Sequence, residues 1–569
     1  MLVTKRTGWL PELAFRAPVA LLLQSRPSLS SSPSVRARVR VHVDAGVVGV
    51  GIALALLAVV SGPRLDDDSY RHFARSVQAV ASLDGRGLIT NLWNKPLTGL
   101  IYGVTGLLGL TAARLAAVAL TMLTLHLTVE LCQVLLPRAV RWPMLLLFVS
   151  QPALLRDAFV TMTEIPAACC LASSLWAQLC AGRARWAAFA IGLMPLCRVE
   201  MLPVTLFVTL WLAHAAAVRG LREQLVLLAL AALPSLAWYA AAAVVAHDAL
   251  WFRGQGYARV RAWDLAGCLR FNVFGGLAAV LSAPSLLLFW LGVLSARRML
   301  TRSVAALVLG ALACHYALLD VLDVFPRGVE GVPLGHAVAA INPRNYTSSA
   351  PLVAVCCGSG LAYRLEAGSV ARRPLMAAAL LSAAVIVNGD IAQPVALLRD
   401  SALLASSIAV LGFRAPARAW QAWALASVTA ALIMRPGFGY PTRWNDRRAA
   451  SIDALAQLAR DRHPARLIQD LASSLEHYAG LQGVDADWIW PRDFATRMND
   501  ESVVVIEVDA EQHALARYPA NLSACLTPRA LVAAYDSPAQ PSWLSLIDRV
   551  VARNAAVHWR AYRPPAHCP

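Results

Sequence analysis

The sequence predicts an all-α polytopic membrane protein that carries a small α/β domain at its C-terminal end. Of its 569 residues 58% are hydrophobic and 15% are charged, a balance that is unusual for a soluble protein. Apolar runs of roughly 15 to 25 residues recur along the chain, and such runs fit the thickness of a bilayer. From residue 435 onward the sequence becomes much more polar, which predicts a separate soluble domain over 435–569.

The net charge of +17 is explained by membrane topology rather than by nucleic acid. Many arginines stand in short loops between apolar runs, where they set the orientation of the neighbouring spans. A nucleic-acid-binding protein would instead gather its positive charge on one face or along one segment. We therefore expect membrane lipid as a partner and no nucleic acid.

The 11 cysteines carry no metal or redox signature. Most of them stand inside apolar runs, and the sequence has no CxxC pair. Buried cysteines of this kind act as small hydrophobes. Cys525 and Cys568 lie in the polar tail, where they either form a disulfide, if the tail is outside the cytosol, or remain two thiols.

The first 43 residues are rich in arginine and serine and predict a basic, disordered arm on the cytosolic side. A signal peptide is a weaker interpretation because the apolar part near Leu21 is short. The membrane domain is expected over residues 44–434, and its first span over residues 45–62. The first outer loop then covers residues 63–111.

The remaining apolar runs bring the total to roughly thirteen spans, provided that residues 97–110 lie at the interface or form a re-entrant segment. The later spans are predicted at 112–136, 142–155, 158–181, 186–197, 199–218, 223–246, 273–295, 303–321, 346–366, 374–389, 401–413 and 419–434. With the arm inside, the six inner loops are "PRAVRW", "GRARW", "RGLRE", "ARRMLTR", "YRLEAGSVARR" and "RAPAR". Each carries at least two arginines, as the positive-inside rule predicts.

The polar tail is placed outside by the same alternation. In it, "ASIDALAQLARDR" and "ARLIQDLASSLEHYAGL" predict amphipathic helices, and "SVVVIEV" predicts a buried strand. These elements suit a small α/β domain on the outer face of the membrane. The chain shows no internal repeat of the solenoid type.

The topology also gathers ionisable residues on the outer side, although they are far apart in sequence. The candidates are Asp66, Asp67, Asp68, His72, Lys95, Arg114, Asp157, Glu164, Arg198, Glu200 and Arg344, with Tyr346 beside the last. Ionisable groups at membrane depth usually line a functional cavity. Carboxylates can act as a base or as metal ligands, and Lys and Arg can hold phosphate. The mixture suits a lipid phosphate that reacts with an acceptor arriving from outside.

Structural roles compete with this interpretation. Asp66 to Asp68 can begin a helix through "SYRHFARSVQAV", since acids favour a helix N-terminus. Glu164 can pair with a neighbouring arginine, and Arg198 with Glu200 can anchor a hairpin at the interface. His72 is expected at the surface rather than as a ligand. Arg114 is expected as an anchor, and Asp157 as part of a hairpin cap.

The order of these motifs resembles the GT-C superfamily of polytopic glycosyltransferases. The shared order is a first span, an acidic outer loop ("DDDSYRHFARSV"), a Lys-Pro-Leu element ("NKPLTGLIYGVTGLLG") and an arginine at the next span ("TAARLAAVAL"). The resemblance covers roughly residues 45 to 365 and is nearest to a bacterial branch. That branch is similar to protein O-mannosyltransferases, the lipid A aminoarabinose transferase and the mycobacterial arabinofuranosyltransferases.

The resemblance assigns roles to the candidate residues. Its catalytic aspartate in the first outer loop matches Asp67, then Asp68, then Asp66. Its Lys-Pro-Pro-Leu element resembles the stretch at Lys95, here with a single proline. Its acidic position in "MTEIPAACCLA" is Glu164, and its Arg-x-Glu element in "CRVEMLP" is Arg198 with Glu200. Its late Pro-Arg-Tyr element resembles "NPRNYTSSAPLVAV" at Arg344 and Tyr346, with Asn345 inserted.

The activity that the resemblance implies is transfer of a sugar from a polyprenyl-phosphate donor to a glycan, lipid or protein acceptor on the outer face. The aspartate would act as general base in an inverting displacement. Lys95, Arg198 and Arg344 would hold the donor phosphate, and Glu164, Glu200, Tyr346 and His72 would support the site. A divalent metal, Mg²⁺ or Mn²⁺, bound by Asp66 to Asp68 is left open. The protein would reside in a bacterial inner membrane with its N-terminus cytosolic and its tail outside.

Two other function classes remain. A transporter or flippase of a lipid-linked saccharide also needs many spans and buried charges, but such proteins often show inverted repeats and broken central helices. This sequence shows no repeat, and its charges favour one face. An envelope assembly protein acting through the outer tail is the other alternative. The sequence favours the glycosyltransferase.

Overall fold

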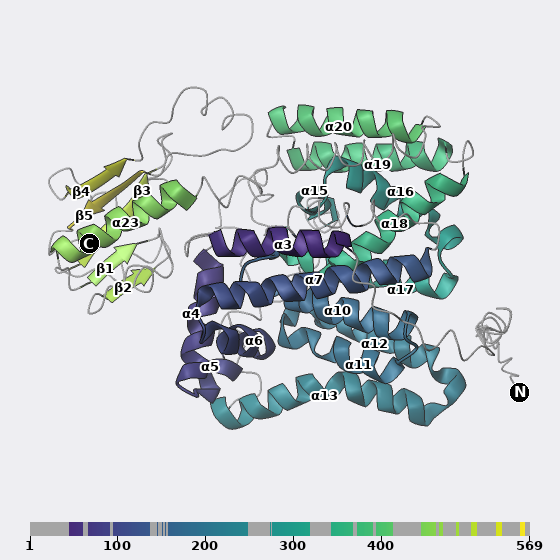
Figure 1. Ribbon diagram of the computed structural model, residues 1–569, viewed down its shortest axis with the longest axis horizontal. Coiled ribbons are helices and arrows are strands. Elements are labelled where there is room, and N and C mark those ends of the chain that lie inside the picture. Colours follow the sequence, from purple (N-terminus) through teal and green to yellow (C-terminus); the bar gives the residue numbers. More distant parts are fainter. Residues whose placement is uncertain are drawn as a thin grey trace, which may run out of the picture.

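The protein is mostly helical, and its helices form one bundle with a small sheet beside it (Figure 1). The computed structural model describes residues 45–60, 67–90, 95–136, 145, 151, 154, 157–247, 273–274, 276–318, 343–367, 372–390, 394–412, 445–462, 466–469, 485–488, 502–508, 531–536 and 558–563. The N-terminal arm over residues 1–43, Asp66, Cys525 and Cys568 lie outside the described residues.

The first outer loop of the prediction folds into three short helices at one end of the bundle (Figure 1). Helix α3 (Ala45–Val60) is followed by α4 (Asp67–Ala81), α5 (Gly85–Ile89) and α6 (Pro96–Gly106), and α7 (Leu110–Leu135) then runs beside α3. Pro96 occupies the first turn of α6, where its missing N–H is harmless. Asp84 caps α5 by accepting a hydrogen bond from the Arg86 amide at 2.9 Å.

The later helices complete the bundle. They are α10 (Glu164–Leu179), α11 (Ala184–Gly192), η1 (Met194–Leu196), η2 (Val199–Met201), α12 (Leu202–Ala215), η3 (Ala217–Arg219), α13 (Leu221–Ala246), α15 (Gly276–Val280), α16 (Ala283–Met299), α17 (Arg302–Leu318), η7 (Pro343–Ser349), α18 (Ala350–Ala367), α19 (Arg372–Asp390) and α20 (Pro394–Gly412). Helices therefore stand over most of the predicted spans, but residues 158–163 and 281–282 are not helical. The predicted spans at 419–434 and most of 142–155 lie outside the described residues.

Two described helices, α7 and α13, have the length and apolar composition of a membrane-crossing helix. Large apolar side chains are also exposed on other helices, for example Leu56 at 60%, Leu206 at 57% and Leu380 at 66%. Soluble monomers rarely expose so much apolar surface. Conversely, Thr128 is buried and donates to the Thr124 carbonyl of its own helix at 2.7 Å. An apolar exterior around such internally satisfied hydroxyls suits a bilayer, while the number of spans stays a prediction.

Helices α16 and α18 approach each other closely, because a glycine of each helix faces the backbone of the other. A Cβ added at Gly292 would collide with the Cys356 carbonyl oxygen, and one at Gly360 would collide with the Leu288 carbonyl oxygen. We expect Gly292→Ala to lower the free energy of unfolding by about 1–3 kcal/mol through overpacking. Gly49→Ala is the control, because nothing lies within 4 Å of that added Cβ. Equal unfolding midpoints in SDS titrations of the two variants would contradict the prediction.

The C-terminal part is a five-stranded mixed sheet with helix α23 (Asn445–Arg462). The strands are β1 (Arg466–Gln469), β2 (Asp485–Trp488), β3 (Ser502–Val508), β4 (Leu531–Asp536) and β5 (His558–Tyr562), in the order β2-β1-β3-β5-β4. Strand β1 pairs parallel with β2 and β3, and β5 pairs antiparallel with β3 and β4.

The predicted elements of the tail are confirmed in two places and wrong in one. The stretch "SVVVIEV" is β3 at the centre of the sheet, with Val503 and Val504 buried, and "ASIDALAQLARDR" lies in α23. The helix predicted over "ARLIQDLASSLEHYAGL" is wrong at its start, where Arg466–Gln469 is strand β1. This short run gains backbone hydrogen bonds to strands on both sides, and such tertiary pairing overrides a helical pattern.

Candidate active site

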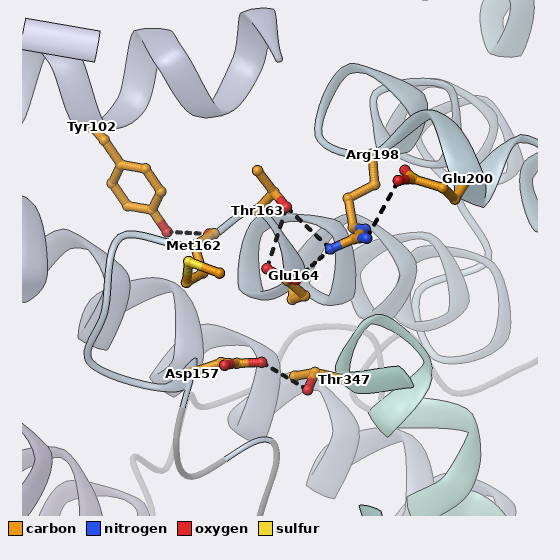
Figure 2. Close-up of polar contacts among 8 residues, drawn as sticks. All are labelled: Tyr102, Asp157, Met162, Thr163, Glu164, Arg198, Glu200 and Thr347. Atoms are coloured by element: carbon orange, nitrogen blue, oxygen red, sulfur yellow. Dashed lines mark hydrogen bonds and ion pairs between the residues drawn. The ribbon is translucent and has the colours of Figure 1, made fainter. Parts of the chain in front are cut away.

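Four other elements hold residues 157–163, a segment that is not helical from residue 158 to residue 163. Figure 2 shows two of these contacts, those of Thr347 and Tyr102. Thr347 of η7 donates to the Asp157 carboxylate at 2.9 Å. Thr121 of α7 donates to the Ala158 carbonyl at 2.9 Å, and Tyr102 of α6 donates to the Met162 carbonyl at 2.9 Å. The fourth element is α4, whose Ser69 contacts Thr161. The predicted span over 158–181 was expected to be helical throughout, so this segment corrects its beginning.

The sequence explains why α10 begins only at Glu164. Pro166 stands in the first turn, and proline has no N–H to donate to the carbonyl four residues earlier. That carbonyl belongs to Met162, and it accepts the Tyr102 hydroxyl instead. The break in helical hydrogen bonding at Met162 is therefore satisfied by a neighbouring helix, and the chain before Glu164 is free to run between α4, α6 and α7.

Arg198 lies at the centre of a buried ionic cluster (Figure 2). Its Nη1 forms an ion pair with Glu164 and donates to the Thr163 hydroxyl at 3.3 Å. Its Nη2 faces Glu200 at 3.5 Å. Glu164 is 0% exposed and stands in the first turn of α10, where the helix dipole favours a carboxylate. The alternative that Glu164 pairs with a neighbouring arginine is thus confirmed. This ion pair fixes the position of the Arg198 guanidinium.

Lys95 joins this cluster from the residue before α6. Its side chain is buried, and it interacts electrostatically with both Glu200 and Arg198. Burial lowers the pKa of the Lys95 ammonium to about 8; attraction to Glu200 works against this, and repulsion from Arg198 adds to it. The formal charges of Lys95, Arg198, Glu164 and Glu200 sum to zero. An added phosphate would therefore need at least one further cation.

Tyr346 and His72 are both buried, the first in η7 and the second on α4. The Tyr346 ring lies 4.7 Å from the Tyr316 ring and 5.9 Å from the His315 ring, measured between centroids. His315, one of these three rings, also interacts electrostatically with Glu200 of the ionic cluster. The expectation that His72 lies at the surface is wrong, because α4 turns that face toward α6 and the 157–163 segment.

The predicted catalytic aspartates stand at the start of α4. The helix begins at Asp67, continues through Asp68 and reaches Ser69, whose side chain is bonded to Thr161. The prediction that acids begin a helix through "SYRHFARSVQAV" is confirmed for these two residues. Arg344 belongs to η7, three residues before Thr347. The backbone thus places the predicted base and the third predicted phosphate ligand on elements that hold the 157–163 segment.

A metal site is not formed by the side chains that the structure describes: no group of three or more His, Cys, Asp or Glu among them is placed to hold an ion. A divalent cation at Asp66 to Asp68 stays a prediction. The chemistry available within the described cluster is that of ion pairs and hydrogen bonds. The sequence alone did not identify Tyr102, Thr161, Thr347 and His315. Tyr102, Thr161 and His315 are common residue types in apolar surroundings, and Thr347 follows the Arg344 and Tyr346 element without being part of it.

Among solved structures the chain is similar to the crystal structure of ArnT from Cupriavidus metallidurans bound to undecaprenyl phosphate. The sequence identity is 14%, the TM-score is 0.49, and the match covers 90% of this chain and 97% of that chain. No family model matches the chain, and no curated protein matches it. At this identity and TM-score, the function of the chain has to be argued from its own residues.

Proposed function

We propose that the chain is a membrane-embedded glycosyltransferase of the GT-C type. It transfers a sugar from a polyprenyl-phosphate donor to an acceptor on the outer face of the membrane. The observation that carries the proposal is the buried cluster of Lys95, Glu164, Arg198 and Glu200, beside the helix that Asp67 begins. Lys95, Glu164 and the neighbouring pair Arg198 and Glu200 come from three parts of the chain. Removing such charges from water is costly, and ionisable groups at membrane depth mark functional sites.

The donor phosphate binds on the positive side of this cluster. Lys95 and Arg198 supply the positive charge, and the negative charges of Glu164 and Glu200 already balance it. Arg344, on η7, supplies the additional positive charge that a phosphate needs. Spread over three side chains, this charge stabilises the negative charge that grows on the phosphate as the glycosidic bond breaks.

Asp67 acts as the general base, with Asp68 and then Asp66 as the next candidates. It removes the proton of the acceptor hydroxyl while the hydroxyl oxygen attacks the anomeric carbon. The bond from that carbon to the phosphate oxygen breaks, and the phosphate keeps the electron pair. A single displacement of this kind inverts the anomeric centre. Tyr346 and His72 support the walls of the site, and the C-terminal domain lies on the same outer side.

The experiment that tests this function uses the purified protein in lipid nanodiscs with a panel of labelled polyprenyl-phosphate sugars. We expect turnover with one donor, with release of the polyprenyl phosphate and inversion at the sugar. Absence of turnover with every donor, in protein shown to be folded, would contradict the proposal. Vectorial movement of an intact lipid-linked sugar would point to the transporter class instead.

Binding of undecaprenyl phosphate should weaken as the pH rises through about 8, because the Lys95 ammonium loses its proton there. An ordinary lysine would hold its charge to about pH 10.4. Protein stability changes in the opposite sense: between these values the unfolded chain binds more protons, so the free energy of unfolding rises with pH. Affinity measured from pH 6.5 to 10 checks the prediction. Lys95→Arg is the control, and an equal pH dependence in both proteins would contradict the role of Lys95.

A further inference from the structure

Ser69 and Thr161 are joined by three hydrogen bonds. The Thr161 amide donates to Ser69 Oγ at 3.0 Å, and the Thr161 hydroxyl donates to the Ser69 carbonyl at 2.6 Å. The two hydroxyl oxygens are 2.9 Å apart. Since the Thr161 hydrogen is used on the carbonyl, the Ser69 hydroxyl donates to Thr161 Oγ1. Each hydroxyl therefore has one donor and one acceptor role filled.

We call these three hydrogen bonds between Ser69 and Thr161 the clamp. The clamp fixes the orientation as well as the position of α4. Thr161 holds both the side chain and the main chain of Ser69, so the first turn of the helix can neither slide along the 157–163 segment nor rotate against it. Both residues are buried. Buried polar groups that lose a partner carry a large penalty, which favours a single arrangement of the two elements.

Both residues of the clamp are close in sequence to residues of the proposed active site. Asp67 and Asp68 immediately precede Ser69 in the same helical turn. On the other side, Thr161 is followed after one residue by Thr163, which binds Arg198, and then by Glu164. Consecutive Cα atoms are about 3.8 Å apart, so the chain between Ser69 and each group is short and leaves little slack.

We propose that Ser69 and Thr161 are positioning residues, which hold the aspartates at the start of α4 in register with the Glu164–Arg198 cluster. The inference rests on the proposed function, because it names the base and the phosphate ligands that are held together. Neither residue touches the reacting atoms. Their effect is on the geometry of the base relative to the bound donor, and errors of about 1 Å in such geometry can cost roughly a hundredfold in rate.

The test compares Ser69→Ala and Thr161→Val with the wild-type protein in nanodiscs. We expect kcat to fall roughly tenfold to a hundredfold, while KM for the donor and the affinity for undecaprenyl phosphate change little. Ser69→Thr and Thr161→Ser keep a hydroxyl and should restore most of kcat. The double variant should lose no more than the worse single variant, because each change alone breaks the clamp.

Ser76→Ala is the matched control. Ser76 is also a buried serine of α4, but its hydroxyl donates to the His72 carbonyl of its own helix at 2.6 Å. We expect this variant to keep its kcat. An equal loss of kcat in Ser76→Ala and Ser69→Ala, or a loss confined to KM, would overturn the positioning role.

Amide hydrogen exchange separates this inference from the proposed function. Breaking the clamp should speed amide exchange in peptides covering both 67–81 and 157–163, whether or not a donor is known. Ser76→Ala should not speed exchange in the 157–163 peptide. Faster exchange in a protein without turnover would uphold the clamp and count against the glycosyltransferase. Unchanged exchange at 157–163 in Ser69→Ala would overturn the clamp, even if the wild-type protein is active.

Discussion

Replacing Arg198 by Met should lower the free energy of unfolding by roughly 3–5 kcal/mol, because it leaves buried carboxylates without their partner. Arg198 forms the ion pair with Glu164 and faces Glu200, and these side chains are between 1% and 11% exposed. Methionine keeps much of the apolar volume, so the loss reports on charge rather than on a cavity. SDS-titrated unfolding of the protein in mixed micelles measures it.

The exposed ion pair between Arg185 and Glu223 provides a matched control. Arg185 contacts Glu223 at 2.9 Å, but the Arg185 side chain is 65% exposed. Exposed pairs contribute about 0–1 kcal/mol, so Arg185→Met should be nearly neutral. Adding Glu164→Gln to Arg198→Met should recover part of the lost stability, because the uncompensated charge is removed. Similar losses in the two arginine variants would show that the cluster is not the buried network described above.

The apolar pattern predicted the helices well because burial in lipid or protein dominates their placement. Helix α3 and helix α7 follow their predicted spans closely. The pattern failed where backbone hydrogen bonding decides the structure. Residues 158–163 are as apolar as a span, yet they are not helical, because Pro166 and the Tyr102 hydroxyl remove Met162 from the helical ladder. In the tail, pairing on both sides made Arg466–Gln469 a strand.

The charged members of the site were predictable because charge is rare in this sequence. Lys95, Glu164, Arg198 and Glu200 stand out against apolar neighbours, and the alternation of spans placed them on one side. The neutral residues that organise the site were not. Thr161 is 92 residues from Ser69, and Thr347 is 190 residues from Asp157. A threonine or serine hydroxyl gives no sign in the sequence of so distant a partner.

Asp67→Asn should abolish sugar transfer while folding and membrane insertion stay intact. Asparagine has almost the same shape as aspartate but cannot take up the proton of the acceptor hydroxyl, and loss of a general base costs about 10²–10⁴ in rate. The first turn of α4 keeps its clamp through Ser69, so the helix should not move. Single-turnover release of polyprenyl phosphate in nanodiscs measures the chemical step apart from donor binding.

Two further aspartates decide what the result means. Asp84→Asn changes a carboxylate that caps α5 through the Arg86 amide, in the same predicted outer loop, and should leave turnover within about twofold, because an asparagine cap is equivalent. Asp68→Asn tests the neighbouring candidate. Loss of turnover in Asp68→Asn but not in Asp67→Asn would identify Asp68, rather than Asp67, as the general base. Normal turnover in both Asp67→Asn and Asp68→Asn would remove the base from the start of α4, and with it the reason for placing that helix against the Arg198 cluster.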